Sequence, residues 1–129
     1  MDNLIVTKRI EPYDLIEGIK KNYTVEDFTF TGYNKFDILE SFLNKMQELS
    51  KNVIAFGLYM KNVNKFYLIS STIEPIHLEE NINTIVLNNI LGLSQSDLVN
   101  KNGIEYTDDR EKALSAIDMG KAEASFIFF

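Results

Sequence analysis

Two apolar runs separated by a four-residue linker constrain the fold of this chain most strongly. Residues 53–60 and 65–70 are rich in β-branched and aromatic side chains, and the linker 61–64 has a length typical of a β-hairpin. Gly57 lies inside the first run, which indicates a bulge or a close approach to the backbone. Packing is the favoured reason for this glycine, with ligand access as the alternative. We expect a central hairpin.

Helical periodicity marks the segments on either side of this hairpin. Apolar residues recur at i, i+3, i+4 and i+7 over 35–49, and a stripe this apolar must pack on another surface. Further helices are predicted from Pro12, which suits a first helical turn, and over 82–91. Strands are predicted over 4–10 and 23–30.

The last part of the chain follows a strand, helix, strand pattern. A strand over 104–107 precedes a capping box, in which Asp108 accepts a backbone N–H and Glu111 reaches back. Gly120 is the expected C-terminal cap, and an apolar strand follows over 124–129. This order predicts a compact βαβ unit, so that at least two strands are expected to be parallel.

These elements predict an α+β fold, with a mixed β-sheet covered by helices, a central β-hairpin and a C-terminal βαβ unit. Hydrophobic residues make up 45% of the 129 residues, which is enough for a substantial core. No repeat, low-complexity tract or linker divides the chain. We therefore expect one domain spanning residues 1–129.

Composition excludes several classes of function. The chain has no Cys, and His77 is its single His, so no cysteine- or histidine-pair metal site and no cofactor are expected. His77 is interpreted as an ordinary surface residue. The net charge of −6 disfavours nucleic acid as a partner, because that binding depends on neutralising phosphates. Neither a signal peptide nor a membrane helix is indicated, so a cytoplasmic location is expected.

Four charged residues are candidate ligand-binding positions. Lys8 and Arg9 follow a predicted strand and would suit a phosphate or carboxylate, although a solvated pair is the commoner interpretation. Asp108 and Asp109 would suit Mg²⁺ with a nucleotide, although helix capping already explains them. Only two arginines are present, so any bidentate clamp on an anion must use Arg9 or Arg110. No catalytic residue is singled out.

The apolar segment 126–129, Phe-Ile-Phe-Phe, is unusual at the end of a chain. It predicts either a strand buried centrally in the sheet or a chain that once continued. If the strand is exposed, it offers an edge for pairing with a second copy or a partner. Tyr59 and Tyr67 are expected to pair across the central hairpin.

The chain resembles the C-terminal part of the domain-of-unknown-function 1015 proteins. The similarity rests on several segments in the same order, which are 6–9, 55–59, 65–68, 90–93, 104–106, 109–113 and 116–126. Arg9 retains a family position, whereas Lys8 and Asn83 stand where the family has histidines. The family's Gly-His-His-Arg-Tyr motif, in its ParB-like N-terminal region, and its later Lys-Ser-Thr-Tyr-Phe segment are absent from this chain.

The resemblance implies a non-catalytic scaffold or ligand-cleft domain of a ParB-like small-molecule kinase of the serine type. Its partner would be an N-terminal ParB-like domain, and the isolated chain is expected to be inactive. Two alternatives remain open at this point. One is a self-contained protein-interaction or homodimerisation module, and the other is a small-metabolite-binding domain.

Overall fold

A six-stranded β-sheet forms the centre of the molecule in the computed structural model, which describes residues 3–71 and 103–129. The strand order is β2-β4-β3-β6-β1-β5. The strands are β1 (Asn3–Val6), β2 (Thr24–Thr29), β3 (Ile54–Met60), β4 (Lys65–Ser71), β5 (Ile104–Thr107) and β6 (Ala124–Ile127). The helices of the described residues are α1 (Pro12–Lys20), α2 (Lys35–Ser50) and α5 (Arg110–Asp118).

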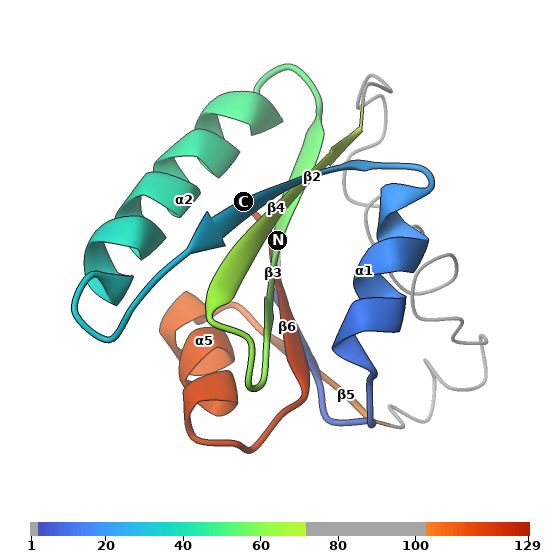
Figure 1. The fold of residues 1–129 in the computed structure, drawn as a ribbon, viewed down its shortest axis with the longest axis vertical. Coiled ribbons are helices and arrows are strands. Elements are labelled where there is room, and N and C mark those ends of the chain that lie inside the picture. Colours follow the sequence, from blue (N-terminus) through green and yellow to red (C-terminus); the bar gives the residue numbers. More distant parts are fainter. Residues whose placement is uncertain (1–2, 72–102) are drawn as a thin grey trace.

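Helices cover both faces of this sheet (Figure 1). Helix α1 packs on one face through Ile16 and Ile19, in a cluster that includes Phe56 and Phe126. Helices α2 and α5 pack on the opposite face, in a second cluster. Because side chains alternate along a strand, each central strand supplies apolar residues to both clusters. The predicted α+β class and the helical covering are confirmed.

The central hairpin is confirmed, and α2 explains the glycine within it. Strands β3 and β4 pair antiparallel, with Gly57 opposite Leu68. A Cβ atom at Gly57 would lie 2.4 Å from Cζ of Phe42 and 2.6 Å from Cε of Met46, both on α2. Since real Cβ atoms keep a larger distance, glycine allows the helix to approach the strand closely. The packing interpretation of Gly57 is therefore correct.

The expected pairing of two tyrosines across the hairpin is wrong. Tyr59 lies opposite Phe66, and Tyr67 lies opposite Leu58. The two tyrosines are thus one position out of register, and a shift of one residue places a side chain on the other face of the sheet. Tyr59 packs in the cluster under α2 and α5, whereas Tyr67 packs in the cluster under α1.

The C-terminal strands are arranged differently from the expected βαβ unit. Strand β1 pairs antiparallel with both β5 and β6, and it lies between them. Strands β5 and β6 therefore run in the same direction without being neighbours. Every strand pair of the described residues is antiparallel. Within the described residues the sheet is therefore antiparallel and not mixed. A local βαβ unit would place β5 and β6 side by side, but β1, from the start of the chain, lies between them.

The apolar C-terminal strand is central and does not form an exposed edge. Strand β6 pairs with β3 on one side and with β1 on the other. The backbone N–H of Phe128 donates to Oδ1 of the buried Asn3 at 3.0 Å, which extends this attachment beyond the strand. Pairing with a second copy through β6 is therefore excluded, because both of its edges are occupied.

The predicted helix boundaries are close to those observed. The periodic segment 35–49 corresponds to α2, and the helix from Pro12 corresponds to α1. Gly120 follows α5 with φ +71°, and the N–H of Lys121 donates to the carbonyl of Ala116, which confirms the predicted C-terminal cap. The predicted helix over 82–91, together with His77 and Asn83, lies outside the described residues. Within the described residues, no helix has the length and apolarity needed to cross a bilayer.

Candidate functional site

The structure separates the four charged residues that the sequence suggested. In the ladder between β1 and β5, Val6 lies opposite Ile104 and Asn3 lies opposite Thr107. The pair Lys8 and Arg9 follows β1 at one end of this ladder, whereas Asp108 and Asp109 follow β5 at the other end. The two pairs do not converge on one ligand site.

The acidic pair has a structural role at the start of α5, one residue later than predicted. Asp109, not Asp108, is the N-cap, and its Oδ1 accepts the backbone N–H groups of Glu111 at 3.0 Å and Lys112 at 3.3 Å. Asp109 keeps an extended backbone conformation, and its N–H donates to Oγ1 of Thr107 at 3.1 Å, so the helix begins only at Arg110. Asp109 therefore stabilises the helix N-terminus, and Asp108 is exposed beside it.

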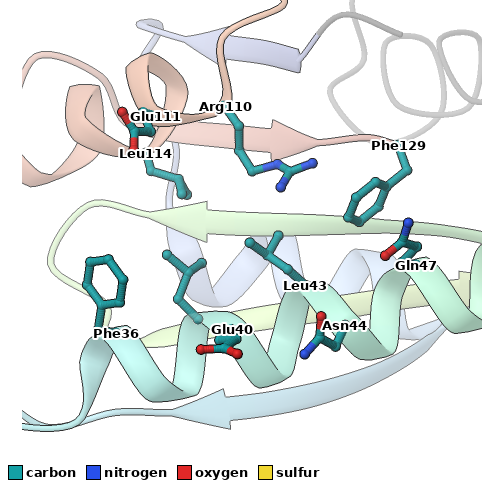
Figure 2. Close-up of a pocket in the computed structure, with 10 residues that line it drawn as sticks. Phe36, Glu40, Leu43, Asn44, Gln47, Arg110, Glu111, Leu114 and Phe129 are labelled. Atoms are coloured by element: carbon teal, nitrogen blue, oxygen red, sulfur yellow. The ribbon is translucent and has the colours of Figure 1, made fainter.

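Helices α2 and α5 border a groove of about 390 Å³ on the sheet face that they share (Figure 2). Its apolar lining consists of Phe36, Leu39, Leu43, Leu114 and Phe129. Its polar lining consists of Glu40, Asn44, Gln47, Arg110 and Glu111. Volumes of about 300 Å³ and above are typical of small-ligand sites, which are mostly apolar with a few polar groups.

Both walls of the groove are anchored to the sheet. On α2, the fully buried Phe42 stacks against Phe66 of β4, with ring centroids 5.2 Å apart. On α5, the carbonyl of Ala113 accepts a hydrogen bond of 2.7 Å from the hydroxyl of Ser125 on β6. A buried contact on each helix therefore holds the groove at a defined width.

Arg110 is the one basic residue in this lining, and it is held by an aromatic ring. Its guanidinium carbon lies 4.5 Å from the ring centroid of Phe129, in the range of a cation–π contact. Its Nε is buried and has no hydrogen-bond partner among the described residues. Nor does Arg110 form an ion pair with any carboxylate of residues 3–71 and 103–129. Among the described residues, Arg110 is therefore a positive charge without a counterion.

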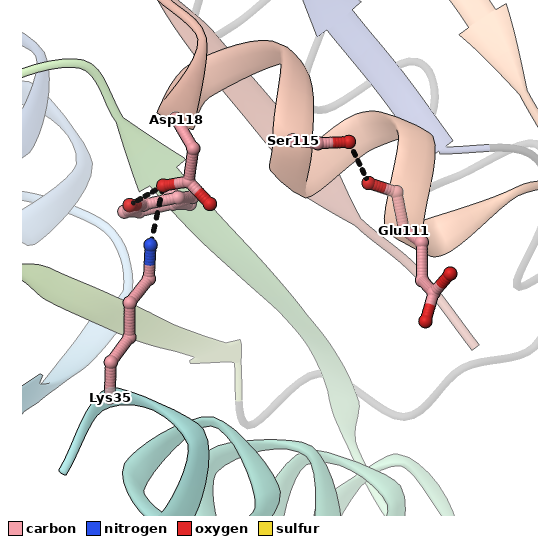
Figure 3. Close-up of polar contacts among 5 residues, drawn as sticks. Lys35, Glu111, Ser115 and Asp118 are labelled. Atoms are coloured by element: carbon pink, nitrogen blue, oxygen red, sulfur yellow. Dashed lines mark hydrogen bonds and ion pairs between the residues drawn. The ribbon is translucent and has the colours of Figure 1, made fainter. Parts of the chain in front are cut away.

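A polar cluster ties the first turn of α2 to the last turn of α5 (Figure 3). Oδ1 of Asp118 lies 2.5 Å from Nζ of Lys35 and accepts a hydrogen bond of the same length from the Tyr59 hydroxyl. The Lys35 ammonium also lies 5.3 Å from the ring centroid of Phe30 and 5.1 Å from that of Tyr59. This cluster joins the two helices that border the groove.

Burial and charge act together on the proton affinities of this cluster. Burial lowers the pKa of Lys35, but hydrogen bonding with Asp118 and the contact with Tyr59 outweigh it, so the pKa rises above its ordinary value. Burial also raises the pKa of the Tyr59 hydroxyl, and Asp118 raises it further, while Lys35 opposes the shift. Both groups therefore keep their protons at neutral pH.

Sequence reasoning found part of this site. Arg110 was one of the two possible anion clamps, but nothing in the sequence indicated its ring partner, Phe129. The cluster of Lys35, Tyr59 and Asp118 was missed, because its members come from three distant segments without a shared motif. Within the described residues, no group of three or more His, Asp or Glu side chains is placed to hold a metal ion.

Comparisons of the chain with models of protein families, with curated proteins and with solved structures found no match. Membership of the domain-of-unknown-function 1015 family thus stays a prediction. The function is therefore inferred from the geometry of the groove between α2 and α5.

Proposed function

We propose that this domain is a non-catalytic binding domain whose ligand site is the groove between α2 and α5. The observation that carries the proposal is an apolar hollow that contains a cation with no counterion among residues 3–71 and 103–129. Apolar groups supply contact area for a ligand, and a few polar groups orient it. The other polar groups of the lining are amides and carboxylates at exposed positions of the two helices.

The family resemblance extends this proposal to a longer protein. There, the domain would contribute a ligand cleft to a ParB-like small-molecule kinase, and the chemistry would belong to the N-terminal partner domain. A domain with this role binds its ligand alone but does not turn it over.

The test is to fill the groove and measure the loss of binding. In Gln47→Trp, a large ring would enter the groove from an exposed position of α2. Ser41→Trp is the matched control, because Ser41 is exposed on the same helix but does not line the groove. Small apolar molecules with different head groups are titrated while amide chemical shifts are recorded. We expect shifts around the groove in the wild type and Ser41→Trp, and their loss in Gln47→Trp.

A second candidate function is a protein-interaction module, which two exposed aromatic residues favour. Tyr33 is fully exposed in the turn before α2, and Phe36, in the first turn of α2, is 84% exposed. Aromatic residues at the surface are enriched in interfaces. A dimer through this surface predicts twice the monomer mass by light scattering, and a return to the monomer mass in the double variant Tyr33→Ser, Phe36→Ser. A monomeric wild type at high concentration excludes the homodimer.

A further inference from the structure

We infer that the groove between α2 and α5 recognises an apolar monocarboxylate, with the guanidinium of Arg110 as the carboxylate receptor. The inference rests on the proposed function and specifies the ligand class. Guanidinium stacked on an aromatic ring uses its face for that contact and keeps its N–H donors in the plane. The guanidinium carbon of Arg110 lies 4.5 Å from the ring centroid of Phe129, in the range of a cation–π contact, and Figure 2 draws both side chains in the groove.

Within the part of the chain that the structure describes, no hydrogen bond is formed by the guanidinium of Arg110. Its Nε–H is buried without a partner among the described residues, although buried polar groups are normally hydrogen-bonded. The backbone N–H groups of Glu111 and Lys112, in the first turn of α5, do not compete for an anion, because both already donate to Asp109. An anion entering the groove would therefore meet the guanidinium first.

The charges around the groove favour a singly charged anion. Glu40 and Glu111 also line the groove, at exposed positions on opposite helices, and neither forms an ion pair with Arg110. Their charges are screened by water, yet they oppose a dianion such as a phosphate more than a carboxylate. A planar carboxylate also matches the two parallel donors of a guanidinium.

The remaining lining determines the body of the ligand. Leu39, Leu43 and Leu114 line the same groove as Phe129, and their side chains offer no hydrogen bonds. A volume of about 390 Å³ accepts a compact apolar group, such as a phenyl ring or a branched alkyl chain. The ligand class is thus a small acid with one carboxylate and an apolar body.

The experiment compares three probes that share one apolar body, namely phenylbutyrate, phenylbutanol and phenylbutyl phosphate. Each is titrated by calorimetry and amide chemical shifts into the wild type, Arg110→Gln and Arg110→Lys. Lys112→Gln is the matched control, because it removes an exposed cation of α5 that pairs with Glu105 at 3.2 Å outside the groove. We expect phenylbutyrate to bind about tenfold tighter than phenylbutanol, as a charge-assisted hydrogen bond implies. We expect Arg110→Gln to abolish that difference and Lys112→Gln to preserve it.

The outcomes separate this inference from the proposed function. If phenylbutanol binds as tightly as phenylbutyrate in the wild type, the carboxylate assignment is wrong while the groove remains a binding site. Tighter binding of the phosphate overturns the preference for a monocarboxylate, and an equal effect of Lys112→Gln overturns the role of Arg110. If no probe shifts the groove amides, both proposals fall. Arg110→Lys keeps the positive charge but lacks the two parallel N–H donors of the guanidinium, so it should bind phenylbutyrate with intermediate affinity. This variant provides the test if Arg110→Gln does not fold.

Discussion

Replacing Gly57 by alanine tests the closest contact between helix and sheet. In an unhindered strand, alanine is more stabilising than glycine by about 0.5–1 kcal/mol. Here the added methyl group would lie 2.4 Å from Cζ of Phe42 and 2.6 Å from Cε of Met46. The end of Met46 can move, but the Phe42 ring is fully buried and stacked on Phe66. Overpacking of this kind costs about 1–3 kcal/mol, so Gly57→Ala is expected to destabilise the domain by that amount.

The assay is urea unfolding at 25 °C, followed by far-ultraviolet circular dichroism. Gly18→Ala is the matched control, because no atom lies within 4 Å of its added Cβ, and it should gain about 0.5–1 kcal/mol in the interior of α1. Phe42→Leu removes the ring that blocks the methyl group. The cost of Gly57→Ala should therefore shrink in that background, with a coupling energy of about 1 kcal/mol or more. A Gly57→Ala variant as stable as the wild type would refute the close-packing argument.

Two further predictions concern α5 and its attachment. Asp109→Ala should lower the free energy of unfolding by about 1 kcal/mol through loss of the N-cap, whereas Asp108→Ala should change it little. Equal losses for the two variants in urea unfolding would contradict the assignment of Asp109 as the N-cap. The pKa values of Lys35 and Tyr59 are raised in the folded state. Their contribution to the free energy of unfolding is therefore complete below pH 10.0, the ordinary tyrosine value, and is lost as the pH rises through the pKa values of the folded state. The urea concentration at the unfolding midpoint should therefore decrease between pH 9 and about pH 11. Asp118→Asn should lower that midpoint at pH 8 and make its decrease with pH smaller. A midpoint that rises over this pH range would contradict the direction of the shifts.

Features that depend on neighbouring residues could be predicted from the sequence. The apolar stripe of α2, the hairpin of β3 and β4 and the Gly120 cap are each determined by spacing or backbone conformation within one segment. One such feature, the N-cap of α5, is predicted one residue away from its observed position. The predicted cap is Asp108, one residue too early, because two adjacent aspartates suit the cap equally well and only the extended backbone at Asp109 distinguishes them.

The binding site was less predictable, because it joins residues from separate segments. Arg110 could be selected as one of two arginines, but its position over Phe129 requires β6 to end beside the start of α5. The charged pairs after β1 and β5 were the sequence's candidates, and the antiparallel register placed them at opposite ends of the ladder. Charge and residue type alone do not determine which residues meet.

By itself, the sequence determined an α+β domain with a central hairpin, because helical and strand periodicities are written in consecutive residues. Only the tertiary structure decided that β1 separates β5 from β6 and that β6 has no free edge. Strand order depends on which distant segment best completes the buried sheet, and that is a property of the whole core. The groove follows from the same choice, since it exists only because α2 and α5 cover one face of that sheet.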